Sequence, residues 1–197
     1  MMKENKMISL VKEYAIKNSE NNDIHGFDHV ERVFKLSIFI GEKVHANLKI
    51  LKLAALLHDI GRIQEKNDKL KRNHAEISAE LAKPFLASNQ YNLTQNEIDE
   101  IIHCIQTHSF SNKSVPKTLE AKILSDADKL DALGAIGLYR TIGFTILRNG
   151  GLNDVIEHLE NKILKLKNRL FLDVSKEIAK SREKLIINFY EKIKDQK

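Results

Sequence analysis

Two residues able to bind a metal ion, His58 and Asp59, close the stretch 48–60, which is otherwise largely apolar. A third, His29, stands near the start of an amphipathic segment. Three carboxylates lie in the apolar stretch 123–138, namely Asp126, Asp128 and Asp131. Burying an unpartnered carboxylate is costly, and a divalent cation offsets that cost. Imidazoles with carboxylates suit Mn, Fe, Co, Ni or Zn, and Mg with added waters. The pattern predicts a divalent metal site, although any one of these residues taken alone is more often a cap or surface group.

These residues have to be positioned by helices. The chain has 197 residues with 2 prolines and 8 glycines, too few for the turns of an all-β fold. Apolar residues recur at helical spacing, and no segment shows sustained alternation with period two. We predict an all-α fold in one domain over 1–197. Helices are expected near 7–15, 27–46, 48–60, 73–88, 94–108, 118–141, 153–168 and 174–194, with loops at 109–117 and 143–151. Pro84 is expected to kink or interrupt its helix.

Composition limits the class of partner. Lys and Arg total 32 against 27 Asp and Glu, a net charge of +5. The two signs alternate along the chain, which favours a solvated surface over a nucleic-acid interface. Cys104 is the single cysteine, so no intrachain disulfide can form, and we expect a reducing, cytoplasmic setting. No uncharged apolar run approaches the roughly 20 residues of a membrane span, and Lys12 and Glu13 argue against a signal peptide.

Three runs in register carry a family resemblance. They are His29-Val-Glu-Arg-Val33, Leu53-Ala-Ala-Leu-Leu-His-Asp-Ile-Gly61 and Ser125-Asp-Ala-Asp-Lys-Leu-Asp131. In order, spacing and helical context they resemble the H…HD…D signature of HD-domain metal-dependent phosphohydrolases, in particular the small stand-alone bacterial and archaeal HD proteins. The resemblance implies a compact multi-helix bundle, with an HD core at about 24–140 and a helical extension at about 150–197.

The resemblance implies four metal ligands, His29, His58, Asp59 and Asp128. Helix periodicity does not choose among the three carboxylates of the last run, because Asp131 lies nearest the apolar stripe and the other two flank it. The choice of Asp128 rests on the Ala-Asp-Lys-Leu context shared with the family. A hydrogen bond to a neighbouring element is the competing role for Asp131.

Further residues are candidates for a second metal or a phosphate pocket: His74, His103, His108 and Lys129. On the helix that begins after Thr94, His108 lies close to the apolar stripe and His103 lies well off it. Only the family resemblance indicates that the side chain of His103 points toward the site. Arg62 follows the HDIG run, where a guanidinium can bind phosphate, although a charge at a helix end is an equal alternative. We expect Asp59, Arg62 and His103 to serve catalysis.

The function predicted is a metal-dependent phosphohydrolase that acts on a small phosphorylated substrate, with a nucleotide favoured. The alternatives are a di-iron oxygenase of HD fold and a non-enzymatic binding module. The acidic pair that follows the HD dipeptide in alarmone hydrolases is absent, and so is the GYP extension of cyclic-dinucleotide phosphodiesterases. No Walker-type glycine loop is present. Neither a membrane nor a nucleic acid is expected as a partner, and the sequence does not define the oligomeric state.

Overall fold

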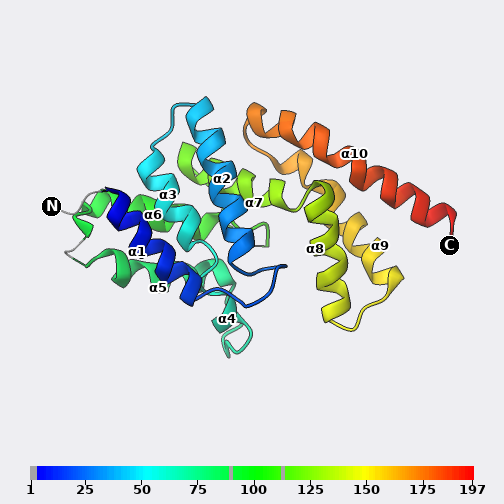
Figure 1. Cartoon of the computed structure of the whole chain (residues 1–197), viewed down its shortest axis with the longest axis horizontal. Coiled ribbons are helices and arrows are strands. Elements are labelled where there is room, and N and C mark those ends of the chain that lie inside the picture. Colours follow the sequence, from blue (N-terminus) through cyan, green and yellow to red (C-terminus); the bar gives the residue numbers. More distant parts are fainter. Residues whose placement is uncertain (1–3, 89–90, 112–113) are drawn as a thin grey trace. The chain divides into compact units, whose positions relative to one another are not determined.

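The computed structural model describes residues 4–88, 91–111 and 114–197, and its fold is all-α, as predicted (Figure 1). No strand occurs among these residues. The chain divides into two compact units, Met1–Ser125 and Asp126–Lys197. The expectation of a single domain stays a prediction, and each unit is described by itself.

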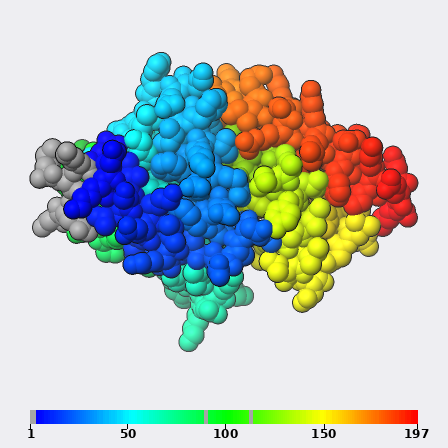
Figure 2. Space-filling view, in the orientation of Figure 1, coloured from blue at the N-terminus to red at the C-terminus, as the bar shows by residue number. Residues whose placement is uncertain are grey.

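The first unit is a helical bundle built around α3. Its helices are α1 (Glu4–Lys17), α2 (Phe27–Lys43), α3 (Leu48–Leu57), α4 (Arg62–Glu65), α5 (His74–Leu86) and α6 (Gln95–Thr107), followed by the start of α7 (Leu119–Asp131). On the face seen in Figure 2, residues of α1 and α2, in blue, form much of the surface of this unit. The segment around α4 projects from the unit in Figures 1 and 2.

Helix α3 is the core of this unit. The side chain of Asn47 accepts hydrogen bonds from the backbone N–H groups of Lys49 and Ile50, which starts the helix. From Ile50 onward every residue of α3 except Lys52 is buried, and the helix contacts α1, α2, α5 and α6. Burial of one leucine or isoleucine side chain stabilises the fold by about 1.5–3 kcal/mol. The end of α3 is therefore held firmly in the interior.

Helices α5 and α6 begin at side-chain caps. Asn73 accepts from the N–H of Ala75, and Thr94 and Glu97 form a complete capping box. Pro84 does not interrupt its helix, because α5 continues to Leu86. Of the expected loop 109–117, residues 112–113 lie outside the described part of the chain.

The prediction of one long helix over 118–141 is wrong. Helix α7 ends at Asp131, and α8 (Gly134–Leu147) begins after a break at which Gly134 has φ +80°. Because α8 continues to Leu147, the expected loop 143–151 is also shorter than predicted. Helix α9 (Leu152–Asn161), two short 3₁₀ turns at 163–165 and 167–169, and α10 (Asp173–Asp195) complete the second unit.

No single helix in the described ranges is both long and apolar enough to cross a membrane. Helices α7 and α8 pass that test of length and composition only when they are taken together as a bent pair.

Candidate metal centre

The end of α3 places two candidate ligands in the interior. His58 follows the last residue of α3, Asp59 comes next, and both are buried. The Nδ1 atom of His58 lies 2.7 Å from the carbonyl oxygen of Ala55. A carbonyl at a helix end has no partner within the helix, so it is available to fix the imidazole. A carbonyl only accepts, so Nδ1 carries the hydrogen and Nε2 points the other way.

His29 approaches from the first turn of α2. Its backbone N–H donates to the carbonyl of Gly26, and its side chain is fully buried. Its Nε2 lies 3.3 Å from Nε2 of His58 and 3.4 Å from Oδ2 of Asp59. The Nε2 of His58 lies 3.6 Å from the same carboxylate oxygen. Ligand atoms on one ion with bonds of about 2.0–2.2 Å are separated by about 3–3.6 Å. These three side chains therefore fit one divalent cation.

The other oxygen of Asp59 faces two further histidines. Nε2 of His74, in the first turn of α5, lies 3.4 Å from Oδ1, and Nε2 of His108, just after α6, lies 3.5 Å from it. Nδ1 of His108 is 2.7 Å from the carbonyl of Ile105, and Nδ1 of His74 is 3.2 Å from Oε1 of Glu65. The imidazoles of His58, His74 and His108 thus share one arrangement, with Nδ1 bonded to an oxygen and Nε2 turned toward Asp59.

This arrangement leaves buried acceptors without donors. Asp59 Oδ1, His74 Nε2 and His108 Nε2 have no hydrogen-bond partner among the described residues. Protonating every imidazole would supply donors, but it would place four cations around one buried carboxylate, beside Arg62. A cation between neutral imidazoles and the carboxylate satisfies all of these atoms at once. The donor set therefore fits a metal ion.

Arg62 lies directly against the carboxylate. Its Nε donates a short hydrogen bond to Oδ2 of Asp59, and its own side chain is 18% exposed. Burial raises the pKa of the Asp59 carboxyl. The guanidinium of Arg62 and the surrounding imidazoles more than offset that effect, so the pKa lies well below its ordinary value. Asp59 is therefore ionised at neutral pH, as a metal ligand must be.

Glu65 is a functional candidate that the sequence reasoning missed. Its Oε1 accepts from the backbone N–H of His74 at 2.8 Å, in addition to the contact with Nδ1. Burial raises the pKa of Glu65, and the bonds from His74 outweigh it, so the pKa is lowered. Burial, followed by the charge of Arg62, lowers the pKa of His74. The available signal was that Glu65 is the first acid after the HD dipeptide.

Gly61 allows α5 to approach this site. Its N–H donates to Oγ of Ser78 at 2.9 Å, and a Cβ on Gly61 would lie 2.6 Å from the backbone nitrogen of Ser78 and 2.7 Å from the carbonyl of His74. Only glycine fits at that separation without displacing the backbone. The close approach brings His74 to Asp59.

His103 is not among the histidines that the structure brings to Asp59. It is half-buried, and its Nε2 accepts a hydrogen bond from the backbone N–H of Lys117 at 3.1 Å. The apolar stripe of α6 had favoured His108 over His103, and the position of His108 agrees with that preference.

The carboxylates of the last run belong to the second unit, and two have structural partners there. Asp126 accepts from the backbone N–H groups of Phe171 and Leu172, each at 2.9 Å, just before α10. Asp131 forms a buried ion pair with Arg140 at 2.7 Å. Lys129 is buried, with Nζ 5.2 Å from the ring centre of Phe171, and burial lowers its pKa. Asp128 is half-buried on α7, and its assignment as a ligand stays a prediction.

Comparison with known proteins defines the family. Residues 26–133 match the HD domain, so the chain belongs to the HD domain family. It is 31% identical over 173 residues to the uncharacterized protein YpgQ of Bacillus subtilis (strain 168), covering 84% of this chain and 80% of YpgQ.

Solved structures are similar over nearly the whole chain. The crystal structure of B. subtilis YpgQ in complex with ADP has a TM-score of 0.80 at 26% identity, covering 100% of this chain and 97% of that one. A crystal structure of an HD-superfamily hydrolase from Bacillus thuringiensis has a TM-score of 0.73 at 25% identity, with 98% of each chain covered.

Proposed function

We propose that this protein is a metal-dependent phosphohydrolase that acts on a small phosphorylated substrate, with a nucleotide favoured. The observation that carries the proposal is the convergence of buried histidine Nε2 atoms on both oxygens of Asp59. Membership of the HD domain family and similarity to an HD-superfamily hydrolase support the reaction class. A bound metal ion supplies an activated water and neutralises charge on the phosphoryl oxygens.

In this proposal His29, His58, Oδ2 of Asp59 and Asp128 would hold one ion. The argument for Asp128 adds helix geometry to the family motif. Ser125 donates to the carbonyl of His108 at 3.0 Å, and a residue three positions further along α7 lies on the same helix face. Oδ1 of Asp59, His74 and His108 would form a second binding position that suits another cation, because three acceptors line it; a phosphate there would require both imidazoles to be protonated.

The chain's own residues then have distinct tasks. Asp59 remains ionised, and the oxygens that contact Nδ1 of His58, His74 and His108 fix those rings so that Nε2 faces the carboxylate. Arg62 is partly exposed and contacts Asp59, so it can exchange part of that contact for a phosphate oxygen. His103 stays a proposed phosphate contact. Its hydrogen bond to Lys117 would have to be exchanged for that role.

The nucleotide preference has one external support. YpgQ has been crystallised with ADP, which is a property of that relative. Nucleotides are therefore the first substrates to test here.

The decisive experiment measures metal binding and phosphate release on the same protein. Mn²⁺, Co²⁺, Ni²⁺ and Mg²⁺ are titrated by calorimetry, and each is assayed with a nucleotide panel. We expect His58→Ala and Asp59→Asn to abolish metal-dependent turnover, and the exposed His45→Asn to retain it. Turnover in either site variant at wild-type level with wild-type metal content would contradict the proposal.

One observation keeps a di-iron oxygenase as a second candidate. Both oxygens of Asp59 face histidine pairs, so this carboxylate would be able to bridge two ions. Tightly held iron after anaerobic purification, together with oxygen consumption, would favour it. Phosphate release that depends on Mn²⁺ or Mg²⁺ without oxygen uptake would exclude it.

A further inference from the structure

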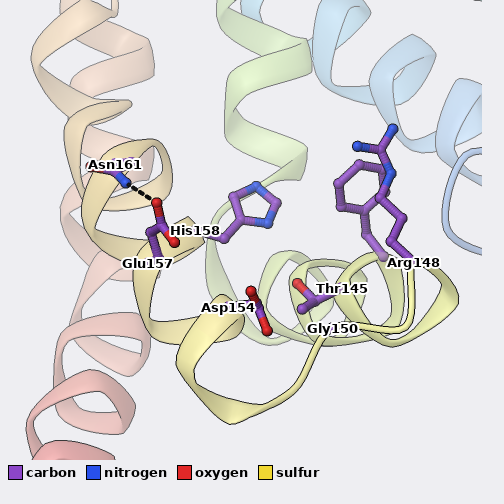
Figure 3. A pocket seen from close by; sticks show the side chains of 8 residues that line it. Thr145, Arg148, Gly150, Asp154, Glu157, His158 and Asn161 are labelled. Atoms are coloured by element: carbon purple, nitrogen blue, oxygen red, sulfur yellow. Dashed lines mark hydrogen bonds between the residues drawn. The ribbon is translucent and has the colours of Figure 1, made fainter.

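The second unit contains an open pocket between α8 and α9 that no part of the metal centre uses (Figure 3). Its volume is about 330 Å³, and its lining includes Phe144, Arg148, Asp154, Glu157 and His158. Small-molecule sites have volumes of about 300–1,000 Å³, so this pocket suits a small ligand.

Arg148 provides an available positive charge. Its guanidinium carbon lies 4.2 Å from the ring centre of Phe144, and within the described chain its side chain has no hydrogen bond or ion pair. Stacking on an aromatic ring fixes the guanidinium plane and leaves its N–H edge available to an anion.

Two carboxylates provide the opposite charge. Oδ2 of Asp154 accepts from the N–H of Gly151 at 2.8 Å, and Oε1 of Glu157 accepts from Asn161 at 3.3 Å. Each carboxylate therefore has a second oxygen without a partner in the described residues. In Figure 3, Arg148 and Glu157 stand on opposite sides, with Asp154 and His158 between them. No ion pair joins Arg148 to either acid in this part of the chain, so the charges are held apart.

His158 adds a neutral polar group. Its ring lies 5.6 Å from that of Phe144, and its nitrogens have no hydrogen-bond partner among the described residues. Burial, followed by the charges of Lys162 and Arg148, lowers its pKa. At neutral pH one ring nitrogen can donate a hydrogen bond and the other can accept one.

We propose that this pocket binds a small zwitterion of the amino-acid class, with its carboxylate on Arg148 and its ammonium group on Asp154 and Glu157. A simple anion would meet two carboxylates, and a simple cation would meet a guanidinium. A ligand that carries both charges pairs with all three groups, so that no charged group loses water without gaining a partner of opposite charge.

The test is calorimetry on the full chain with each of the standard L-amino acids. We expect at least one to bind with a Kd of about 1 mM or tighter. Its amide, which lacks the carboxylate, and the corresponding acid without the amino group should each bind about tenfold more weakly or worse. If no amino acid binds at about 10 mM, or if either half-ligand binds as tightly, the proposal is wrong.

Variants locate the site. Arg148→Gln and Glu157→Gln change exposed side chains and should each weaken binding by about tenfold, with unchanged thermal stability in the absence of ligand. Lys180→Gln is the matched control, because Lys180 is exposed and pairs with Glu177 on α10. Equal binding by Arg148→Gln and wild type would overturn the assignment.

Discussion

Asp59 differs from the other buried carboxylates in what its oxygens face. Asp126 and Asp131 have backbone N–H groups or a guanidinium as partners. Asp59 has Arg62 on one oxygen and imidazole nitrogens around both. At the residue scale, the unpartnered oxygen of Asp59 is what marks it as the functional carboxylate. Burial alone does not distinguish the three acids.

The carboxylates of α7 give a direct comparison. We expect Asp126→Asn to lower the free energy of unfolding by about 1–3 kcal/mol, because it weakens the charge-assisted bonds that hold the start of α10. Activity per folded molecule should persist. Asp128→Asn should instead lower metal affinity and turnover. Urea unfolding together with Mn²⁺ titration separates the two effects. The reverse pattern would move the ligand to Asp126.

Glu65 is predicted to act through His74. Glu65→Gln keeps an acceptor for the backbone N–H, but it removes the charge that holds the Nδ1 hydrogen. We expect the affinity for Mn²⁺ at the position formed by Oδ1 of Asp59, His74 and His108 to fall about 10–100-fold. The free energy of unfolding should change little. Mn²⁺ calorimetry measures the affinity, and the exposed Glu76→Gln is the control. Unchanged affinity for Mn²⁺ would mean that Glu65 serves only to accept the hydrogen bond from the backbone N–H of His74.

At the scale of helices, the site depends on where α3 ends and how closely α5 approaches. We expect Gly61→Ala to cost about 1–3 kcal/mol and to weaken metal binding, because the new Cβ displaces α5 and with it His74. Gly151→Ala is the control, since its Cβ would meet no atom within 4 Å. Thermal unfolding and metal titration provide the measurements. An alanine at 61 with wild-type metal affinity would refute this dependence.

The sequence predicted the helices that carry the metal centre better than those that follow it. An apolar stripe and side-chain caps are local signals, and they located α3, α5 and α6 well. The break between α7 and α8 combines a local feature, the positive φ of Gly134, with a non-local contact. Arg182 of α10 donates to the carbonyl of Leu130 at 2.6 Å, and its side chain lies beside Gly134. A pattern that stays apolar through 132–134 gives no sign of that contact.

At the scale of the whole molecule, we expect a metal ion and protons to compete for the same imidazoles. Mn²⁺ at about 100 times its Kd should stabilise the protein by about 2.7 kcal/mol, and a chelator should reverse this.

The pKa of His74 is near 6.5 in the unfolded chain and lower in the folded protein, so below that pH the unfolded chain binds more protons. Stability and the metal effect should both fall from pH 7.5 to 5.5. Scanning calorimetry measures both, and a metal effect independent of pH would contradict neutral ligands.

Asp59 contributes one oxygen to each of the two proposed ion-binding positions, and this sharing limits how both positions can be occupied. Two divalent cations bring four positive charges, whereas Asp59 and the proposed Asp128 together supply only two negative ones. In the proposed phosphohydrolase, a phosphoryl group entering the site would provide the missing negative charge. Affinity for the second ion and affinity for the substrate are then thermodynamically linked, and each must strengthen the other by the same factor. Metal content measured without substrate would therefore understate the number of ions present during turnover.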